Sequence, residues 1–201
     1  MNEAKPSKSW IRRFFGWLRS PSKLSLIALL SLGFFAGILF WGGFHTAMEV
    51  TNTQKFCIGC HEMQANSYTE YTDTIHFKNR TGVQATCPDC HVPKAWGPKM
   101  LRKMRASLEV WGHWTGAVDT KEKFEKHRME MATREWARFQ ATDSLACRNC
   151  HSWEAMAANK QRPRAQTQHA AAKKEGKTCI DCHKGIAHLL PAEYVDPSEE
   201  E

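Results

Sequence analysis

The strongest constraint on this chain is a short pattern that occurs four times, Cys-x-x-Cys followed at once by histidine. The chain has eight cysteines, and every one belongs to such a motif. The cysteine pairs are Cys57/Cys60, Cys87/Cys90, Cys147/Cys150 and Cys179/Cys182, and the histidines that follow them are His61, His91, His151 and His183. Any fold of the chain must therefore present four similar clusters of two thiols and one imidazole.

This pattern is the attachment signature of c-type haem. Two thioether bonds hold the porphyrin edge, and the adjacent histidine is placed beneath the iron as an axial ligand. Zinc sites also use paired Cys-x-x-Cys, but they do not require a histidine after each pair. Structural disulfides would leave four identical spacings as a coincidence. The sequence therefore predicts four covalently bound haem c groups.

The N-terminal region predicts a membrane anchor. Residues 24–44 contain no charged side chain, and about 20 apolar residues suffice to cross the hydrocarbon core of a bilayer. Residues 1–23 carry six basic side chains and one acidic side chain, which predicts a cytoplasmic N-terminus. The apolar run is longer than that of a typical cleaved signal peptide. We expect a single-pass anchor in a bacterial inner membrane, with residues 45–201 in the periplasm as a tetrahaem domain.

The distribution of charge indicates which partners to expect. The whole chain has a net charge of +7, and residues 1–44 supply +5 of it. The excess of positive charge therefore belongs to the segment that would face anionic lipid. The lipid bilayer is an expected partner, whereas the rest of the chain lacks the basic patch that a nucleic-acid-binding protein needs.

The expected fold is mainly α: one transmembrane helix followed by a small, helical and loop-rich multihaem domain. One helix is predicted from Thr120 to Ala141, with Asp119 as its N-cap and Glu122 completing a capping box. A second helix is predicted over about 98–114. The two halves of the domain each contain two motifs with a histidine between them, and the cysteine pairs are 30 and 32 residues apart. This arrangement predicts an internal two-haem repeat.

A low-spin electron carrier needs a second axial ligand on each iron, and six histidines lie outside the motifs. His76 and His169 hold equivalent places in the two halves, so both are predicted to be distal ligands. His188, five residues after His183, is the third candidate. His113 and His127 lie on the predicted helices and are expected to pack or to face solvent. His45 is expected to be a residue of the membrane interface.

The first haem looks different from the others. Met63 lies two residues after His61, and a thioether sulfur is a known haem ligand, so either side chain could be the proximal donor. The first half has no histidine that matches His188, and Lys94 is the nearest possible donor there. The sixth ligand of this iron is left open between Lys94, a carboxylate and no ligand.

The anchor, the four motifs and the segments "ATCPDCHVP" and "TCIDCHKGIAH" resemble the NapC/NirT family of membrane-anchored tetrahaem quinol dehydrogenases. The resemblance implies that quinol from the membrane pool is oxidised beside the first haem. The electrons would pass to a periplasmic reductase or its cytochrome c subunit, with the periplasmic nitrate reductase as the expected partner. A general hub that feeds several reductases is the alternative. A catalytic multihaem reductase would need an open iron, which most of these sites do not offer.

The resemblance also implies roles for single residues. A related branch of the family uses the methionine that corresponds to Met63 on its first haem. The resemblance would assign His76 to the fourth haem, His188 to the third and, by symmetry, His169 to the second. That branch instead uses a lysine between the second and third motifs on its second haem, and Lys103 is the nearest match in this chain, so Lys103 is the alternative to His169. Glu109 resembles an acidic residue of the quinol pocket, and Lys103 could hydrogen-bond the quinone oxygen. A solvated helix face is the alternative for Glu109 and Lys103.

Overall fold

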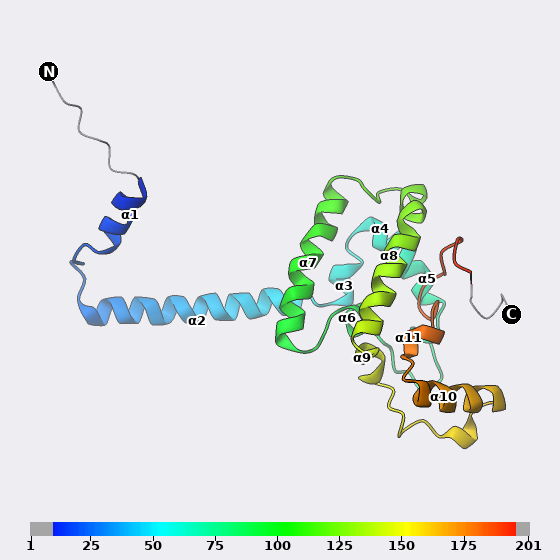
Figure 1. The fold of residues 1–201 in the computed structure, drawn as a ribbon. Coiled ribbons are helices and arrows are strands. Elements are labelled where there is room, and N and C mark those ends of the chain that lie inside the picture. Colours follow the sequence, from blue (N-terminus) through cyan, green and yellow to red (C-terminus); the bar gives the residue numbers. More distant parts are fainter. Residues whose placement is uncertain (1–9, 196–201) are drawn as a thin grey trace. The chain divides into compact units, whose positions relative to one another are not determined.

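The structure is a computed structural model and describes residues 10–195. These residues form eleven α-helices, a π-helix and a 3-10 helix, and the described part of the chain contains no strand (Figure 1). The prediction of a mainly α fold is confirmed. The chain divides into two compact units between Met48 and Glu49, close to the predicted boundary at residue 44.

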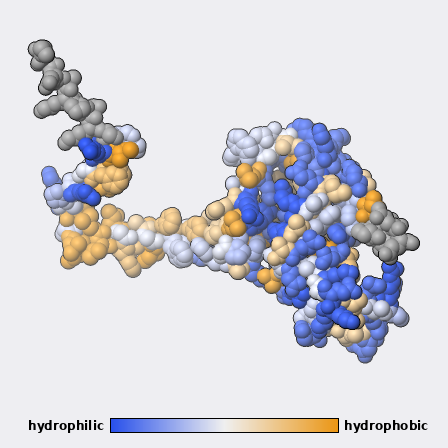
Figure 2. Space-filling model, viewed as in Figure 1, coloured by the Kyte–Doolittle hydropathy of each residue, from blue (hydrophilic) through white to orange (hydrophobic). Residues whose placement is uncertain are grey.

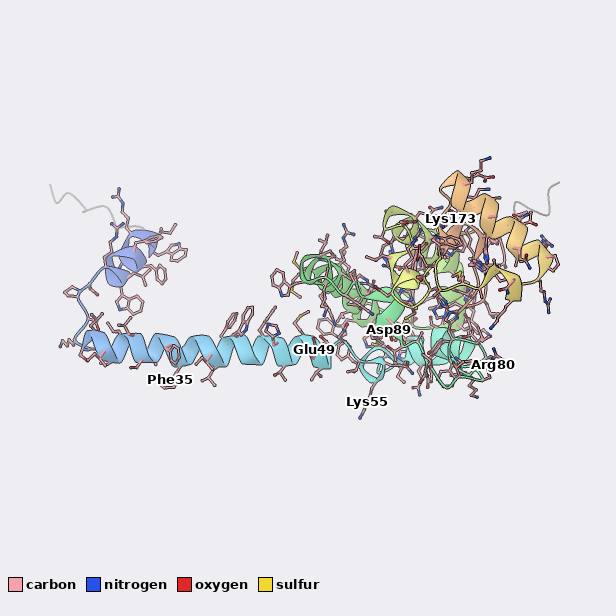
Figure 3. All side chains as sticks on the ribbon, turned by 90° about the horizontal axis from the view of Figure 1, so that it is seen from below. Phe35, Glu49, Lys55, Arg80, Asp89 and Lys173 are labelled. Carbon is pink, nitrogen blue, oxygen red and sulfur yellow. The ribbon has the colours of Figure 1, made fainter. Side chains whose placement is uncertain are left out.

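The first unit contains α1 (Trp10–Leu18) and most of α2 (Leu26–Val50). By length and composition α2 can cross a membrane, and its apolar residues are not buried inside the protein. Figure 2 shows hydrophobic residues gathered along it, and Figure 3 shows Phe35 projecting outward from the helix. The helix continues six residues beyond the predicted segment 24–44, because His45–Val50 contains neither proline nor glycine to end it.

The second unit is built from two long helices and a set of short ones. The long helices are α7 (Trp96–Trp114) and α8 (Lys121–Ala141), and α10 (Pro163–Glu175) is of intermediate length. Each Cys-x-x-Cys-His motif contributes to a short helix. The short elements are α3 (Gln54–Cys57), α4 (His61–Met63), η1 (Gln64–Tyr68), α5 (Thr69–Thr72), α6 (Cys87–His91), α9 (Leu145–Arg148), η2 (Ala158–Lys160) and α11 (Cys179–Cys182).

The boundaries of the long helices differ slightly from the predicted ones. The N-cap of α8 is Thr120, whose hydroxyl accepts a hydrogen bond from the Lys123 amide at 3.3 Å. The prediction of Asp119 as the cap is therefore wrong, because the Asp119 carboxylate instead accepts a hydrogen bond from Lys123 Nζ at 2.7 Å. Helix α7 begins two residues before Pro98, which is tolerated in the first turn because the amide that proline lacks has no partner there.

The second unit buries few apolar side chains. Among the described residues, the buried hydrophobic ones are Tyr71, Phe124, Phe139 and Ile180. A domain normally packs its helices around one continuous apolar core. The small apolar core leaves the interior to other groups, as expected for a domain that encloses several haems.

Polar contacts around Arg128 tie distant segments of this unit together. The Arg128 side chain on α8 is buried and donates hydrogen bonds to both Glu70 carboxylate oxygens, at 2.5 and 3.0 Å, and to Glu125. It also donates to the Leu189 carbonyl at 3.2 Å, and the Leu189 amide donates to Glu70 at 2.9 Å. Helix α5, helix α8 and the C-terminal segment therefore hold one another through this cluster.

Candidate haem sites

The second and fourth motifs begin with the same local structure. The backbone amide and the hydroxyl of Thr86 both donate to the Asp89 carboxylate, and Thr178 makes the same two bonds to Asp181. Each threonine and aspartate form a capping box that starts the short helix carrying the cysteines. These two motifs are thus locally equivalent, while the two-haem repeat of the whole domain stays a prediction.

All eight cysteines are free thiols, so none is committed to a disulfide. Successive motifs lie side by side: α3 packs on α6, and α6 packs on α9. The third and fourth motifs are joined by a hydrogen bond from the Ile180 amide to the Ser144 hydroxyl, at 3.2 Å. Thiols of adjacent motifs also lie close enough to influence one another's pKa, in the pairs Cys57 with Cys87, Cys90 with Cys150, and Cys147 with Cys179. The four attachment motifs therefore form one contiguous row, in chain order.

Each motif histidine lies beside one histidine from outside the motifs. An imidazole nitrogen lies about 2 Å from the metal it binds, so two rings on opposite faces of one ion have their centroids about 6 Å apart. The observed centroid distances are His61–His113 5.8 Å, His91–His188 6.2 Å, His151–His76 6.3 Å and His183–His169 6.0 Å. All four spacings fit one iron between two imidazoles.

These pairs differ from those that the resemblance implies. In the structure His76 lies beside the histidine of the third motif, His188 beside that of the second and His169 beside that of the fourth. The resemblance implied that His76 serves the fourth haem, His188 the third and His169 the second. His113 was expected to pack or to face solvent, and the structure places its ring beside that of His61, the histidine of the first motif. His127 instead lies 3.5 Å from the exposed Glu130 on its own helix.

Several of these imidazoles are oriented through their Nδ1 atoms. Nδ1 of His91 lies 3.3 Å from a Glu135 carboxylate oxygen, and Nδ1 of His169 lies 2.7 Å from the Gln161 amide oxygen. Burial would raise the pKa of Glu135, but His91 and Arg138 outweigh it and lower that pKa to about 2. A polar partner on one ring nitrogen fixes the ring and leaves the other nitrogen for a metal. These side chains therefore suit haem ligation.

His76 and His188 offer a different observation. Their Nδ1 atoms are buried and have no hydrogen-bond partner in the described structure. Burial lowers the pKa of His188, and the neighbouring His91 lowers it further. The neutral imidazole is the form that binds metals.

The first motif is surrounded by polar side chains. Nε2 of His61 lies 3.2 Å from the Asp119 carbonyl oxygen, and Nδ1 of the exposed His61 lies 3.5 Å from Glu62. The Met63 side chain is exposed. Lys94 is also exposed, and it lines a pocket with Asn52 and residues of the second motif. Lys94 thus lines the same pocket as Pro88 and Asp89 of the second motif.

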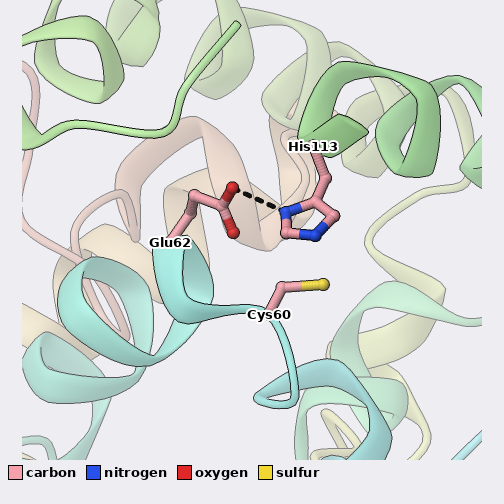
Figure 4. A group of neighbouring side chains, drawn as sticks. All are labelled: Cys60, Glu62 and His113. Carbon is pink, nitrogen blue, oxygen red and sulfur yellow. Dashed lines mark hydrogen bonds and ion pairs between the residues drawn. The ribbon is translucent and has the colours of Figure 1, made fainter. Parts of the chain in front are cut away.

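Cys60, Glu62 and His113 have potential ligand atoms that all lie within 4.8 Å of one another, and Figure 4 shows their three side chains. Glu62 is buried, and its carboxylate lies 2.7 Å from Nδ1 of His113. Burial would raise the pKa of Glu62, but a backbone amide and His113 outweigh it, so the pKa lies below its ordinary value. Because Cys60 is a haem-attachment cysteine, the three residues belong to the first haem site and do not form a separate metal site.

The two predicted quinol-site residues on α7 have separate partners. Lys103 Nζ donates to the carbonyl oxygen of Thr51 at 2.5 Å and to its hydroxyl at 3.1 Å. Burial lowers the pKa of Lys103, and the nearby Cys57 opposes that shift. Glu109 is exposed and forms an ion pair with Arg102 at 3.0 Å. Lys103 therefore lies beside the first motif, while Glu109 is held by Arg102.

Comparison with known proteins gives a consistent assignment. The family described as "NapC/NirT cytochrome c family, N-terminal region" matches residues 19–193. The chain is 56% identical to "Denitrification system component NirT" of Stutzerimonas stutzeri, over 91% of this chain and 92% of that protein. It is 54% identical to "Cytochrome c-type protein NapC" of Escherichia coli K12, over 90% of each chain.

A third relative bears on the cofactor. The chain is 45% identical to "Putative tetraheme cytochrome-c type" of Allochromatium vinosum, over 89% of this chain and 96% of that protein. No solved structure matches the chain. The four Cys-x-x-Cys-His motifs, the family match and this relative together show that the protein carries covalently bound haem c. The chain belongs to the NapC/NirT cytochrome c family.

Proposed function

We propose that this protein oxidises quinol at a bacterial inner membrane and passes the electrons to a periplasmic reductase. The contiguous row of four haem-attachment motifs carries this proposal, because closely spaced redox centres are what electron transfer over a distance requires. When bound, haem supplies an iron that changes its charge by one electron. The protein is thus an electron carrier with quinol dehydrogenase activity.

The proposed topology places residues 1–23 in the cytoplasm, residues 24–44 in the bilayer and residues 45–201 in the periplasm. The apolar α2 helix and the membership of the family support a membrane anchor. The basic residues before α2 support the orientation. The cysteines would then lie in the compartment in which c-type haem is attached.

We assign the histidines opposite the last three motif histidines as distal axial ligands. His188 serves the second haem, His76 the third and His169 the fourth, as the centroid distances of 6.0 to 6.3 Å support. An iron with two imidazole ligands has no open position for a substrate. This ligand set therefore favours electron transfer over a catalytic multihaem reductase.

Lys103 is the residue that we place at the quinol site. It lies beside the first attachment motif, and its ammonium group can donate a hydrogen bond to a quinone oxygen. Helix α7 also exposes a stripe of apolar side chains at helical spacing, which suits an apolar quinol; the stripe comprises Leu101, Met104, Leu108 and Trp111. Glu109 is the proposed proton acceptor, because it is an exposed carboxylate on the same helix as Lys103.

Rapid reduction of the purified protein in detergent by a menaquinol or ubiquinol analogue tests this site. A hydrogen bond to a charged group contributes about 1.5–3 kcal/mol, so Lys103→Gln should slow quinol-driven haem reduction by about tenfold or more. Lys126→Gln, an exposed lysine on α8, is the matched control and should react like the wild type. Dithionite should reduce all variants alike. Unchanged quinol kinetics in Lys103→Gln would remove it from the site, and the same result in Glu109→Gln would remove Glu109.

The proposed electron acceptor is the periplasmic nitrate reductase or its cytochrome c subunit. The relatives named NapC and NirT support it. A second candidate is a general hub, because a 43% identical relative is "Cytochrome c-type protein TorC" of E. coli, of which this chain covers 47%. Mixing the quinol-reduced protein with nitrate, nitrite and N-oxide reductase systems separates the two. Reoxidation by the nitrate system alone supports the first candidate, and comparable reoxidation by several supports the hub.

A further inference from the structure

The first haem site contains a histidine that the sequence pattern did not mark. His113 lies near the C-terminal end of α7, 52 residues after His61, and its ring centroid is 5.8 Å from that of His61. The three other motif histidines each face a histidine at 6.0 to 6.3 Å. His113 and His61 thus complete a set of four similar pairs, one for each motif.

The hydrogen bonds of His113 leave one ring nitrogen for a metal. Its Nδ1 lies 2.7 Å from the carboxylate of the buried Glu62. Two other imidazoles are held in the same way: the motif histidine His91 by Glu135, and His169, which lies outside the motifs, by Gln161. A carboxylate on one nitrogen is the usual support of a metal-bound histidine, because it fixes the ring and makes the other nitrogen a better donor.

The other candidates for this position lie elsewhere or lack such support. Lys94 is exposed and lines a pocket beside the second motif. His127 contacts Glu130 on the outer face of α8, and His45 packs against Trp41 on α2. Glu62 itself is engaged by His113. Of these candidates, His113 is the one that lies beside His61 with its Nδ1 atom held by a partner.

We propose that His113 is the distal axial ligand of the first haem, opposite His61, and that Glu62 positions it. This assignment deepens the proposed function, on which it rests for the role of the first haem as the entry point of electrons. Nε2 of His61 lies 3.2 Å from the Asp119 carbonyl oxygen. The assignment therefore requires the His61 ring, which is 65% exposed, to rotate about its side-chain bonds.

The assignment has a consequence for the reaction with quinol. An iron held by two imidazoles has no free position, so quinol cannot bind to the metal. It must bind beside the porphyrin, within reach of Lys103. Small ligands such as nitrite or hydroxylamine would likewise find no open position on the first iron.

The spin state of the haems in the purified, fully haem-loaded protein tests the proposal without quinol. The wild type should show four low-spin haems, all with bis-histidine signatures in near-infrared magnetic circular dichroism. In His113→Ala one haem of the four should become high-spin, and added imidazole should return it to low-spin. His127→Ala is the matched control and should keep four low-spin haems. Haem content per chain is measured first for every variant.

Two further variants distinguish the loss of an iron ligand from local misfolding. His113→Met retains a possible ligand, so it should stay low-spin and gain one histidine–methionine signature. Glu62→Gln retains a hydrogen-bond acceptor and should also stay low-spin. Four low-spin haems in His113→Ala would overturn the proposal, as would a methionine-ligated or high-spin haem in the wild type. Failure of quinol reduction with these spin states intact would instead count against the proposed function alone.

Discussion

At the scale of single residues, Ser144 links two haem motifs. It precedes α9, which carries the third motif, and its hydroxyl is fully buried and accepts a hydrogen bond from the Ile180 amide of the fourth motif. Asp143 and Ser144 both have positive φ, near +50°. That conformation costs a non-glycine residue roughly 1–2 kcal/mol, and the chain retains it where α8 must turn into α9.

Ser144→Ala should lower the free energy of unfolding by about 1–3 kcal/mol, because the buried Ile180 amide loses its acceptor. Denaturant titration of the haem-loaded protein, followed by circular dichroism, measures the change. Ser107→Ala is the control: its hydroxyl donates to the Met104 carbonyl on the exposed surface of α7, so the change there should stay within about 0.5 kcal/mol. Equal effects of the two substitutions would contradict the proposed link.

At the scale of elements, Arg128 is the contact that joins α8 to α5 and to the C-terminal segment. Removing one partner of a buried ion pair costs about 3–5 kcal/mol, because the other charge stays buried and uncompensated. Arg128→Ala should therefore destabilise the second unit by about this amount, measured by denaturant titration. Arg134→Ala, an exposed arginine on the same helix, should change the stability by less than about 0.5 kcal/mol. A loss below 1 kcal/mol in Arg128→Ala would show that the cluster does not hold the segments together.

At the scale of the whole molecule, the second unit has too small an apolar core to be stable as a bare polypeptide. Its buried hydrophobic residues, among those described, number four. Hydrophobic burial is the main favourable contribution to folding. The haems must therefore supply much of the buried surface, and attachment and folding are coupled.

Limited proteolysis tests this coupling on the chain produced with and without haem attachment. Without haem, residues 49–195 should be cleaved at many sites, whereas the haem-loaded protein should resist cleavage there. The linker between α1 and α2, residues 19–25, is exposed and should be cut equally in both samples. Equal resistance of the two forms would show that the polypeptide folds without its cofactors.

Some features could be read from the sequence because they depend on neighbouring residues. The four attachment motifs, the apolar helix and the long helices are set by short-range spacing and periodicity, so their ranges were predicted to within a few residues except at the end of α2. The N-cap of α8 was misplaced by one residue, from Thr120 to Asp119, because the choice depends on the backbone angles at each position. The hydroxyl of Thr120 and the carboxylate of Asp119 both suit a cap.

The sequence by itself determined the chemistry of this protein, because a covalent attachment motif needs only a few consecutive residues. Only the tertiary structure decided which imidazoles face one another, because such pairs join segments that lie far apart in the chain. His76 meets His151 and His188 meets His91, across 75 and 97 residues. The proposed role of His113 likewise depends on its contact with Glu62, a residue 51 positions away in the chain. The local motifs determine where haem is attached, whereas packing between helices determines which second side chain can reach each iron.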